Sequence, residues 1–385
     1  MTTITAEWVH RPETQAVCNM LEQDGAQALF VGGCVRNTLL GAPVADIDIA
    51  TDALPERVME LSVKAGLKAV PTGIDHGTVT VVSEGVPHEI TTFRRDVETD
   101  GRRAVVVFSK DVAEDAARRD FTMNALYATP DGEIVDPLNG LPDLEARRVR
   151  FIGTASHRIR EDHLRSLRFF RFHAWYGDPA GGMDAEALAA IAENLEGLSV
   201  LSRERIGAEM LKLLSAPDPA PSVASMRQVG VLNALLPGAD DEALAPLIHM
   251  SDSHDPILRL ASLGSGFSDS LRLSKSDARR LDRLREAVET GDPQELGYRL
   301  GKEEGQNALM LRAALLKQLV SDSDLDAARH AADQIFPVEA ADLMPELQGP
   351  ALGAALRRLE ADWIASGFEL TREHLIQRAI DQKEG

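Results

Sequence analysis

Two aspartates separated by a single residue are the feature of this sequence most suited to chemistry. Asp46 and Asp48 flank Ile47 in a run of β-branched and small residues that predicts a strand. Side chains at positions i and i+2 of a strand point to the same side, so these two carboxylates converge. Clustered carboxylate oxygens are the ligands that Mg²⁺ prefers, usually completed by water and substrate phosphates. The pair Asp46 and Asp48 therefore predicts a magnesium site.

A third carboxylate has two candidates. Glu89, in the segment HEITTFRRD, belongs to another predicted strand. Asp120, in RRDF, is the rival. We favour Glu89, because strand geometry can bring it beside the aspartate pair.

A glycine pair precedes the aspartates and suggests a place for phosphate. Gly32 and Gly33 follow a predicted strand at residues 28–31 and precede a predicted helix at 35–40 that carries Arg36. Glycine permits close backbone approach, and backbone N–H groups at a helix start can bind phosphate. No GK[ST] follows and no GxGxxG is present, so neither a P-loop nor a dinucleotide fingerprint is indicated. Each of these features is common by itself. Their combination with the aspartate pair within about twenty residues supports the prediction of a metal and phosphate site.

The elements around these residues are predicted to form a mixed α/β head. Helices are expected at 15–27 and 111–127, and the polar stretch 95–103 is expected to be a loop. Further strands are expected at 47–50, 78–82, 89–93, 104–108 and 133–135. From about residue 155 helical periodicity dominates to the C-terminus. We therefore expect a head at 1–145, a helical neck at 146–215 and a helical body at 216–385.

Length, charge and cysteine content limit the class of protein. A chain of 385 residues is long enough for two or three domains. It has no apolar run long enough to span a membrane and no signal peptide, and its two cysteines form no CxxC pair. These features predict a cytoplasmic protein without a disulfide framework. The formal net charge of −20 argues by itself against a nucleic-acid partner.

A dense basic stretch in the predicted neck weakens that objection. It consists of Arg147, Arg148, Arg150, Arg158, Arg160, Arg165, Arg168 and Arg171. We expect one helix to begin at Glu161, in which Asp162, Arg165, Arg168 and Arg171 share a face because they are spaced by three. For an arbitrary helix such a face is an ordinary solvated ion-paired surface. Trp175 and Tyr176 follow, and core packing is expected for them more than stacking on a base.

These motifs together resemble the class II CCA-adding enzyme and bacterial poly(A) polymerase family. The resemblance rests on GGCVRNTLLG, ADIDIAT, PTGIDHGTVTVV, EITTFRRD, RRDFTMNALY, DPLNGLPDL and IREDHLRSLRFFRF, and covers about residues 28–175 in the same order. It implies an α+β fold, with a polymerase β-like nucleotidyltransferase head followed by an all-helical neck and body. One departure is Asn37, where the family pattern usually has Asp.

The resemblance also implies roles for individual residues. Asp46 and Asp48 are the implied Mg²⁺ ligands, and the implied nucleotide-binding residues are Gly32, Gly33, Arg36, Arg119, Asp162, Arg165, Arg168 and Arg171. Cytosine and adenine each present an amino donor beside a ring-nitrogen acceptor, whereas uracil and guanine present the reverse. A carboxylate that only accepts beside a guanidinium that only donates matches C and A. Asp162 and Arg165 are thus expected to select the base.

The implied activity is template-independent addition of C, C and A to the 3′ end of tRNA, using CTP, ATP and Mg²⁺. Partners are tRNA and the two nucleotides, with no DNA and no membrane. Two alternatives remain at this point: a poly(A) polymerase that uses ATP alone, and a non-catalytic RNA-binding protein on the same fold. The segment PTGIDHGTVTV is similar to the CCA-adding form. Intact Asp46, Asp48 and Glu89 count against a non-catalytic protein.

Overall fold

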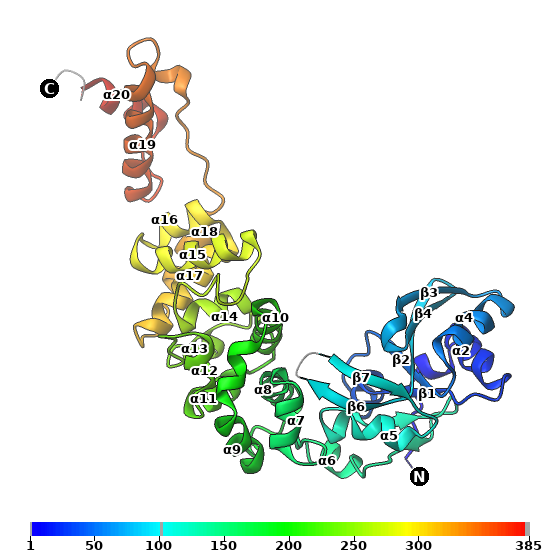
Figure 1. Cartoon of the computed structure of the whole chain (residues 1–385). Coiled ribbons are helices and arrows are strands. Elements are labelled where there is room, and N and C mark those ends of the chain that lie inside the picture. Colours follow the sequence, from blue (N-terminus) through cyan, green and yellow to red (C-terminus); the bar gives the residue numbers. More distant parts are fainter. Residues whose placement is uncertain (1, 101–102, 382–385) are drawn as a thin grey trace. The chain divides into compact units, whose positions relative to one another are not determined.

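The chain folds into two compact units. The computed structural model describes residues 2–100 and 103–381, with side chains described outside residues 96–106. Residues 1–209 and 221–235 form the first unit, and residues 210–220 and 236–385 form the second (Figure 1). The finer division into head, neck and body at residues 145 and 215 stays a prediction.

In the described part of the chain the strands all lie before residue 136, where helices alternate with them, and only helices follow. The strands are β1 (Leu29–Val31), β2 (Ile47–Thr51), β3 (Lys68–Gly73), β4 (Thr78–Ser83), β5 (Val86–Thr92), β6 (Arg94–Asp100), β7 (Arg103–Phe108), β8 (Tyr127–Ala128) and β9 (Ile134–Val135). The helices among them are α1 (Glu7–His10), α2 (Pro12–Glu22), α3 (Gly33–Leu39), α4 (Pro55–Lys64), α5 (Val112–Ala117) and α6 (Leu141–Glu145). This arrangement confirms the predicted fold class, a mixed head followed by helices.

Within the described residues, one mixed sheet organises the head. Its strand order is β3-β4-β5-β2-β1-β8-β9, and β6 pairs with β7 as a separate hairpin. The central strands β2 and β5 are parallel, with Asp48 opposite Glu89 and Ile49 opposite Ile90. The other neighbouring strands of this sheet are antiparallel.

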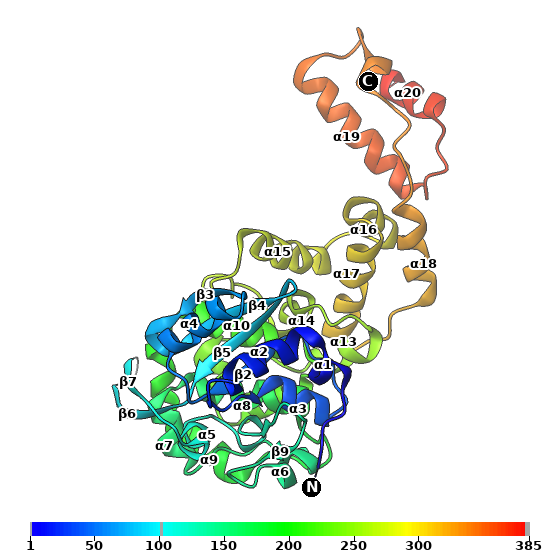
Figure 2. The ribbon, with the colours of Figure 1, turned by 90° about the vertical axis from the view of Figure 1, so that its right-hand side faces the viewer.

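Helices α2 and α4 cover one face of this sheet (Figure 2). His88 and Ile90 of β5 are buried toward that face, and the Thr14 hydroxyl of α2 lies 3.1 Å from His88 Nε2. Strand residues alternate between faces, so Glu89 points to the opposite one. Asp48, paired in register with Glu89, lies there too. Because one face of the sheet is buried under α2 and α4, the carboxylates of Asp48 and Glu89 lie on the opposite face.

Two local predictions in the head were wrong. The helix expected at 111–127 is only α5, capped by the Asp111 side chain and ended at Ala117, after which Phe121 and its neighbours leave the helical path. Phe121 is fully buried, and tertiary packing there overrides the helical pattern. The loop expected at 95–103 is largely the hairpin of β6 and β7, whose residues 101–102 lie outside the described residues.

Further helices follow residue 150 in the first unit, and the one that contains Phe172 packs on the head through aromatic side chains. These helices are α7 (Ala155–Glu161), α8 (Leu164–Tyr176), α9 (Ala185–Glu193), α10 (Arg203–Leu214), α11 (Ala220–Gln228) and α12 (Val231–Leu235), of which α10 continues into the second unit. Phe121 of the head lies 5.0 Å, ring centroid to centroid, from both Phe151 and Phe172. Phe169 stacks on Phe151 at 5.7 Å. This cluster fixes α8 against the segment that contains Arg119 and Asp120.

The second unit is helical throughout its described part. Its helices are α13 (Leu244–Met250), α14 (Pro256–Leu263), α15 (Lys275–Glu289), α16 (Pro293–Leu300), α17 (Lys302–Leu315), α18 (Asp322–Ala331), α19 (Gly349–Ala365) and α20 (Arg372–Asp381). Leu296 and Leu309 belong to one core cluster, and Leu359 and Trp363 to another in the last two helices.

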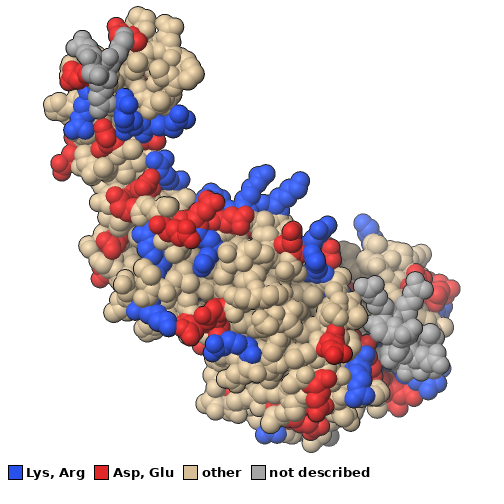
Figure 3. All heavy atoms as spheres, turned by 60° about the vertical axis from the view of Figure 1, so that its left-hand side comes forward, with Lys and Arg blue, Asp and Glu red and all other residues tan. Residues whose placement is uncertain are grey.

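Charged side chains of both signs are spread over the surface. On the face in Figure 3, Lys and Arg are interspersed with Asp and Glu, and several basic side chains project outward. None of the helices in the described part combines the length and apolar character needed to cross a membrane.

Candidate functional site

A pocket of about 400 Å³ in the first unit collects most of the predicted site residues. Its described lining consists of Gly32, Gly33, Arg36, Asp48, Arg118, Arg119, Asp120, Asn124, Asp162, Leu164, Arg165, Arg168, Phe172 and Arg205. Eight of the predicted residues are among them. Asp46, Glu89 and Arg171 are not.

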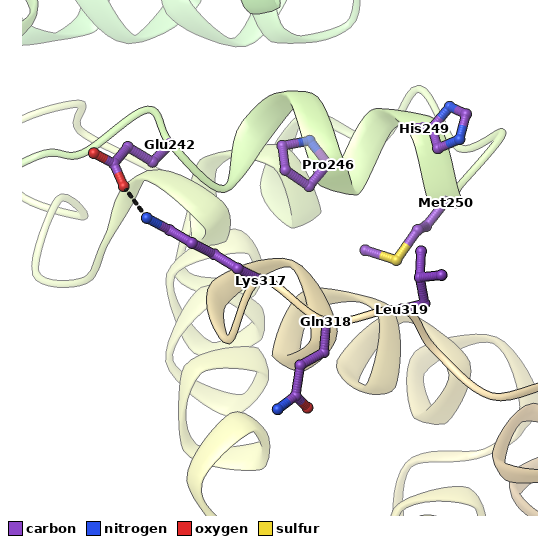
Figure 4. Close-up of a pocket in the computed structure, with 7 residues that line it drawn as sticks. All are labelled: Glu242, Pro246, His249, Met250, Lys317, Gln318 and Leu319. Carbon is purple, nitrogen blue, oxygen red and sulfur yellow. Dashed lines mark hydrogen bonds and ion pairs between the residues drawn. The ribbon is translucent and has the colours of Figure 1, made fainter.

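A larger pocket, of about 580 Å³, lies between α13 and the end of α17 in the second unit (Figure 4). Its carboxylate Glu242 is paired with Lys317 at 2.6 Å, and Met250 and Leu319 supply apolar surface. It therefore lacks the converging carboxylates and guanidinium groups of the first pocket. Chemistry rather than volume identifies the candidate site.

The carboxylate cluster is built by strand register. Asp48 of β2 is the register partner of Glu89 on β5, and Asp46 directly precedes β2. Asp48 is half-buried, whereas Asp46 and Glu89 are exposed. Burial, reinforced by the negative charges of Glu89 and Asp46, raises the pKa of Asp48 to about 6, and Arg119 opposes this rise. The negative charges of Glu89 and Asp46 therefore act on Asp48 electrostatically.

This donor set fits a divalent cation that is completed by substrate. Within the described residues, no group of three or more His, Cys, Asp or Glu side chains is assembled tightly enough to hold a metal by itself. Mg²⁺ commonly takes only one or two carboxylates and obtains its other ligands from water and phosphates. Repulsion among Asp46, Asp48 and Glu89 is also what a cation would relieve.

Asp120, the rival for the third carboxylate, is held by an arginine and by two other hydrogen-bond donors. Its Oδ2 accepts from Arg168 Nε at 2.7 Å, and its Oδ1 accepts from Asn124 Nδ2 at 2.8 Å and from the Phe121 N–H at 2.9 Å. Burial alone would raise the pKa of Asp120, but Arg168 and the hydrogen bonds hold it below its usual value. Asp120 thus anchors an arginine of α8 to the head.

Gly32 adopts a backbone conformation that forms the turn before α3. Gly32 has φ 69° and ψ −115°, a conformation that favours glycine. Its N–H donates to the Leu126 carbonyl at 3.1 Å, so this group is not offered to a phosphate as the sequence suggested. A Cβ at Gly32 would lie 3.5 Å from Arg119 Nη1. The turn therefore brings α3 close to the arginine.

Arg119 is fixed by a buried carboxylate and a phenol. Its Nη2 donates to Asp115 Oδ2 at 2.9 Å, and its Nε donates to the Tyr127 hydroxyl oxygen at 3.1 Å. Tyr127 donates in turn to Asp115 Oδ2 at 2.7 Å. Although burial opposes it, these partners raise the pKa of Arg119, so the guanidinium stays charged. Its position against Gly32 makes it a rigid cation at the pocket.

The strip at residues 161–171 differs from the predicted single helix. Helix α7 ends at Glu161, Asp162 has φ −153°, and α8 begins at Leu164. Asp162 therefore lies in the break between two helices, where its Oδ1 accepts from the Leu164 N–H at 3.1 Å. Its Oδ2 accepts from Arg205 at 2.7 Å. Asp162 thus satisfies the first N–H of α8 from the position before the N-cap His163, and it also lines the pocket.

Arg165 pairs with Glu161 rather than with Asp162. Its Nη1 donates to Glu161 Oε2 and, at 3.0 Å, to the Arg158 carbonyl, while its Nη2 donates to the Arg118 carbonyl at 3.3 Å. A guanidinium has five N–H donors and a carboxylate about four acceptor sites. Arg165 and Asp162 therefore both retain hydrogen-bonding capacity for a base in the pocket.

The remaining arginines of α8 bridge to other elements. Arg168 pairs with Asp120 at 2.5 Å, and Arg171 pairs with Glu209 of α10 at 2.6 Å. Arg171 does not line the pocket. Its prediction as a nucleotide-binding residue is thus without geometric support in this state of the protein.

Sequence reasoning missed five of the described lining residues: Arg118, Asn124, Leu164, Phe172 and Arg205. Arg205 comes from α10, more than forty positions after Asp162, and Asn124 and Phe172 looked like ordinary interior residues. The adjacent acid and base at Glu204 and Arg205 gave no spacing signal toward the pocket. Only the tertiary fold brings them there.

Comparison with known proteins agrees with this geometry. Residues 28–150 match the family model of the poly A polymerase head domain. Residues 182–242 match the model of the probable RNA and SrmB-binding site of polymerase A. Human mitochondrial CCA tRNA nucleotidyltransferase 1 is 31% identical over 384 residues, covering 94% of this chain and 88% of the human protein. The CCA-adding enzyme of Lactobacillus delbrueckii subsp. bulgaricus is 37% identical over 340 residues, with 81% and 82% covered.

Solved structures extend the similarity to the whole fold. The CCA-adding enzyme of Bacillus stearothermophilus in complex with CTP superposes with a TM-score of 0.77 at 27% identity, over 97% of this chain and 98% of that one. An apo form of a CCA-adding enzyme, at 18% identity and a TM-score of 0.73, shares the fold.

The mixed-sheet head, the helical continuation and the arginine-lined carboxylate pocket define a nucleotidyltransferase. Enzymes of this kind are metal-dependent, in keeping with the carboxylates of β2 and β5. Similarity to curated relatives over nearly the entire length narrows the class. The chain belongs to the CCA-adding tRNA nucleotidyltransferase family.

Proposed function

We propose that this chain adds C, C and A, one nucleotide at a time and without a nucleic-acid template, to the 3′ end of tRNA from CTP and ATP. The observation that carries the proposal is the pocket in which Asp48, the arginines of the head and the pair Asp162 and Arg165 meet. Full-length similarity to CCA-adding enzymes supports it. So does the fold shared with a CCA-adding enzyme in complex with CTP.

In the reaction, the RNA 3′-hydroxyl attacks the α-phosphate of the nucleotide and pyrophosphate leaves. We assign Asp46 and Asp48, with Glu89 beside them, to holding Mg²⁺, which would supply activation of the hydroxyl and charge neutralisation of the phosphates. Phosphoryl transfer demands mainly positioning and electrostatic stabilisation. The rigid cations Arg119 and Arg168 provide these at the phosphates.

Base choice is assigned to the break between α7 and α8. The carboxylate of Asp162 accepts a hydrogen bond from the amino group of C or A, and Arg165 donates to the ring nitrogen. Both side chains are held in place by neighbours, Asp162 by Arg205 and Arg165 by Glu161. A firmly held donor and acceptor select against U and G, whose pairing edges present the opposite pattern.

The first test is product length. Given a tRNA that ends at the discriminator base, and all four nucleotides, we expect the enzyme to add C, C and A and then stop. A sequencing gel of the products measures this directly. Long tails of A alone on generic RNA would transfer the assignment to a poly(A) polymerase, and absence of any extension would favour a non-catalytic RNA-binding protein.

A second prediction concerns where the second unit contacts tRNA. Lys275, Arg279 and Arg283 are spaced by four on α15, while Leu281 and Leu284 bury the opposite side of the helix. The three cations are exposed and make no hydrogen bond or ion pair with another part of the described chain. Three unneutralised charges along one helical face suit an RNA backbone.

Replacing all three by Gln should weaken tRNA affinity roughly tenfold or more. The slope of log K against log salt should also become shallower, by about one for each phosphate that the variant no longer neutralises. Filter binding across a salt series measures both quantities.

A matched control replaces Arg299, Lys317 and Arg329 by Gln. These are in the same unit and each is already paired with a carboxylate, so the net charge change is identical. The control variant should keep most of the wild-type affinity. Equal weakening by both triple variants would show that only net charge matters.

The cytoplasmic location stays a prediction. The human relative carries a mitochondrial designation in its name, so family membership alone does not assign a compartment.

A further inference from the structure

The face of the head sheet that carries the carboxylates continues beyond them across β5, β4 and the edge strand β3. Glu89 of β5 is paired in register with Thr80 of β4, and Thr80 is paired with Val70 of β3. Residues paired in this way point to the same face, so one line across four strands is formed by Asp48, Glu89, Thr80 and Val70. Val70 is 38% exposed, and Glu89 is exposed as well. The line therefore leads from the carboxylates to the edge of the sheet along an accessible surface.

Threonine hydroxyl groups cover the middle of this surface. The hydroxyl oxygens of Thr72 and Thr80 lie 2.9 Å apart, and those of Thr78 and Thr91 lie 3.2 Å apart. Thr72 is exposed and the other three are half-buried, and we name these four residues the threonine surface. A hydroxyl group has one proton and two lone pairs, so each bonded pair uses one of its two protons and keeps the other for a ligand. The threonine surface is thus neutral and can both donate and accept hydrogen bonds.

A lysine lies at the outer edge of the same face. Lys68 of β3 is paired in register with Val82 of β4, two positions along from the pair of Val70 and Thr80, so it points to the same side. Lys68 is exposed, and its ammonium group makes no hydrogen bond or ion pair with another part of the described chain. Its charge is therefore available to an anion.

The nucleotide pocket lies on the other side of Asp48. Strand β1, which leads into the turn at Gly32, neighbours β2 on one side, and β5 neighbours β2 on the other. The described lining of the pocket contains Gly32 and Gly33 but no residue of the threonine surface. In phosphoryl transfer the attacking and leaving oxygens lie roughly in line, on opposite sides of the phosphorus. With the triphosphate in the pocket, the attacking 3′-hydroxyl therefore approaches Asp48 from the side of β5.

We propose that the threonine surface and Lys68 bind the 3′-terminal nucleotides of the RNA substrate, with Thr72 and Thr80 bonding to a ribose 2′-hydroxyl and Lys68 to a backbone phosphate. The inference rests on the proposed function and deepens it, because it assigns a place to the RNA end that attacks. Neighbouring strands are about 4.8 Å apart, so Thr80 lies about 10 Å from Asp48, within reach of the last nucleotides of the strand.

The chemistry of each part of the surface suits the part of the RNA assigned to it. A 2′-hydroxyl group both donates and accepts hydrogen bonds, as the pair of Thr72 and Thr80 does, and it distinguishes RNA from DNA. Close to Asp48 and Glu89 a backbone phosphate would be repelled, whereas a neutral ribose is not. The cation of Lys68, at the edge farthest from these carboxylates, is where a phosphate is attracted.

Lys68→Gln tests the phosphate contact. We expect the KM for tRNA to rise roughly threefold and the slope of log K against log salt to become shallower by about one, because one phosphate contact is lost. The KM for CTP should stay unchanged. Lys64→Gln is the matched control, since Lys64 is also exposed but belongs to α4, which covers the opposite face of the sheet. Equal effects of the two variants would refute the contact, because net charge would then explain both.

A second experiment combines a change in the enzyme with a change in the RNA. Thr72→Val and Thr80→Val together remove both hydroxyl groups and keep the β-branched shape. The substrates are tRNA that ends at the discriminator base and the same tRNA with a 2′-deoxyribose at its last or at its penultimate nucleotide. For the wild type, kcat/KM should fall roughly tenfold with one of the two deoxyribose substrates, since a hydrogen bond to the ribose is lost.

In the double variant the same comparison should give a ratio at least fivefold smaller, because the protein partner of the 2′-hydroxyl is already missing. Any effect of the 2′-hydroxyl on the reactivity of the RNA itself is the same for both enzymes and cancels. The KM for CTP should be unchanged. A purely structural role of the threonines would slow both substrates equally and leave the ratio as it is in the wild type.

Thr129→Val is the matched control, because Thr129 follows β8 near the other end of the sheet, where its hydroxyl accepts from the Glu133 N–H at 3.1 Å. This variant should keep the wild-type ratio. Thermal unfolding identifies any variant that fails to fold, and Thr80→Val alone then decides the question. An unchanged ratio in a folded, active variant would overturn the inference and leave the proposed function intact. A wild type that extends no RNA would overturn both.

Discussion

Asp48→Asn is expected to lower kcat by roughly a thousandfold or more, which corresponds to about 4 kcal/mol of transition-state stabilisation. The substitution keeps the shape of the side chain and removes its charge. Asp48 is the acidic residue shared by the pocket and by the carboxylate cluster, and it lies in register with Glu89. Without it, a divalent cation would lack its most firmly placed protein ligand.

Single-turnover extension of tRNA with CTP at a fixed Mg²⁺ concentration measures this effect, with tRNA affinity followed in parallel. Affinity should change little, because Asp48 is assigned to the metal ion rather than to the RNA. Asp131→Asn, at an exposed position in the head, is the matched control and should retain activity. Chelation by EDTA should stop wild-type extension, and added Mg²⁺ should restore it. Near-normal turnover of the Asp48 variant would refute the metal assignment.

Asp162→Ala is expected to reduce discrimination in favour of CTP and ATP over UTP and GTP by roughly ten- to a hundredfold. The amino group of C or A would have no acceptor in the pocket, and an unsatisfied buried donor costs roughly 1–3 kcal/mol. Each 1.4 kcal/mol corresponds to a factor of about ten. The penalty should fall on the correct nucleotides, so selectivity and not merely rate decreases.

Competition assays with pairs of nucleotides give the ratio of kcat/KM values directly. Asp184→Ala is a suitable control, because Asp184 also caps a helix of the first unit, accepting from the Ala187 N–H at 2.8 Å. Its removal likewise deprives a first-turn N–H of its carboxylate acceptor, and Asp184 does not line the pocket. Arg205→Ala, which frees the Asp162 carboxylate, should lower selectivity partially. A uniform fall in rate with unchanged selectivity after Asp162→Ala would assign that residue to structure alone.

Local sequence patterns were sufficient to predict the carboxylate pair and several strands of the head, but not α4, β3 or β6. Alternation in β2 places Asp48 between two inward-facing isoleucines, and that two-residue period is local information. The turn at Gly32 was likewise evident, since few other residues adopt its φ of 69°. The helical character after residue 155 follows from the periodicity of apolar residues.

The partner that each charged side chain takes depended on the tertiary structure. The sequence could not indicate that Arg205 reaches Asp162 or that Asp120 anchors Arg168. Ion pairs form between residues distant in the chain once packing has fixed the backbones, and many alternative pairings have equal local plausibility. Tertiary packing likewise explains why α5 is shorter than predicted, because burial of Phe121 outweighs helical propensity. Local periodicity specifies the elements, whereas the free energy of burying and pairing their side chains specifies the site.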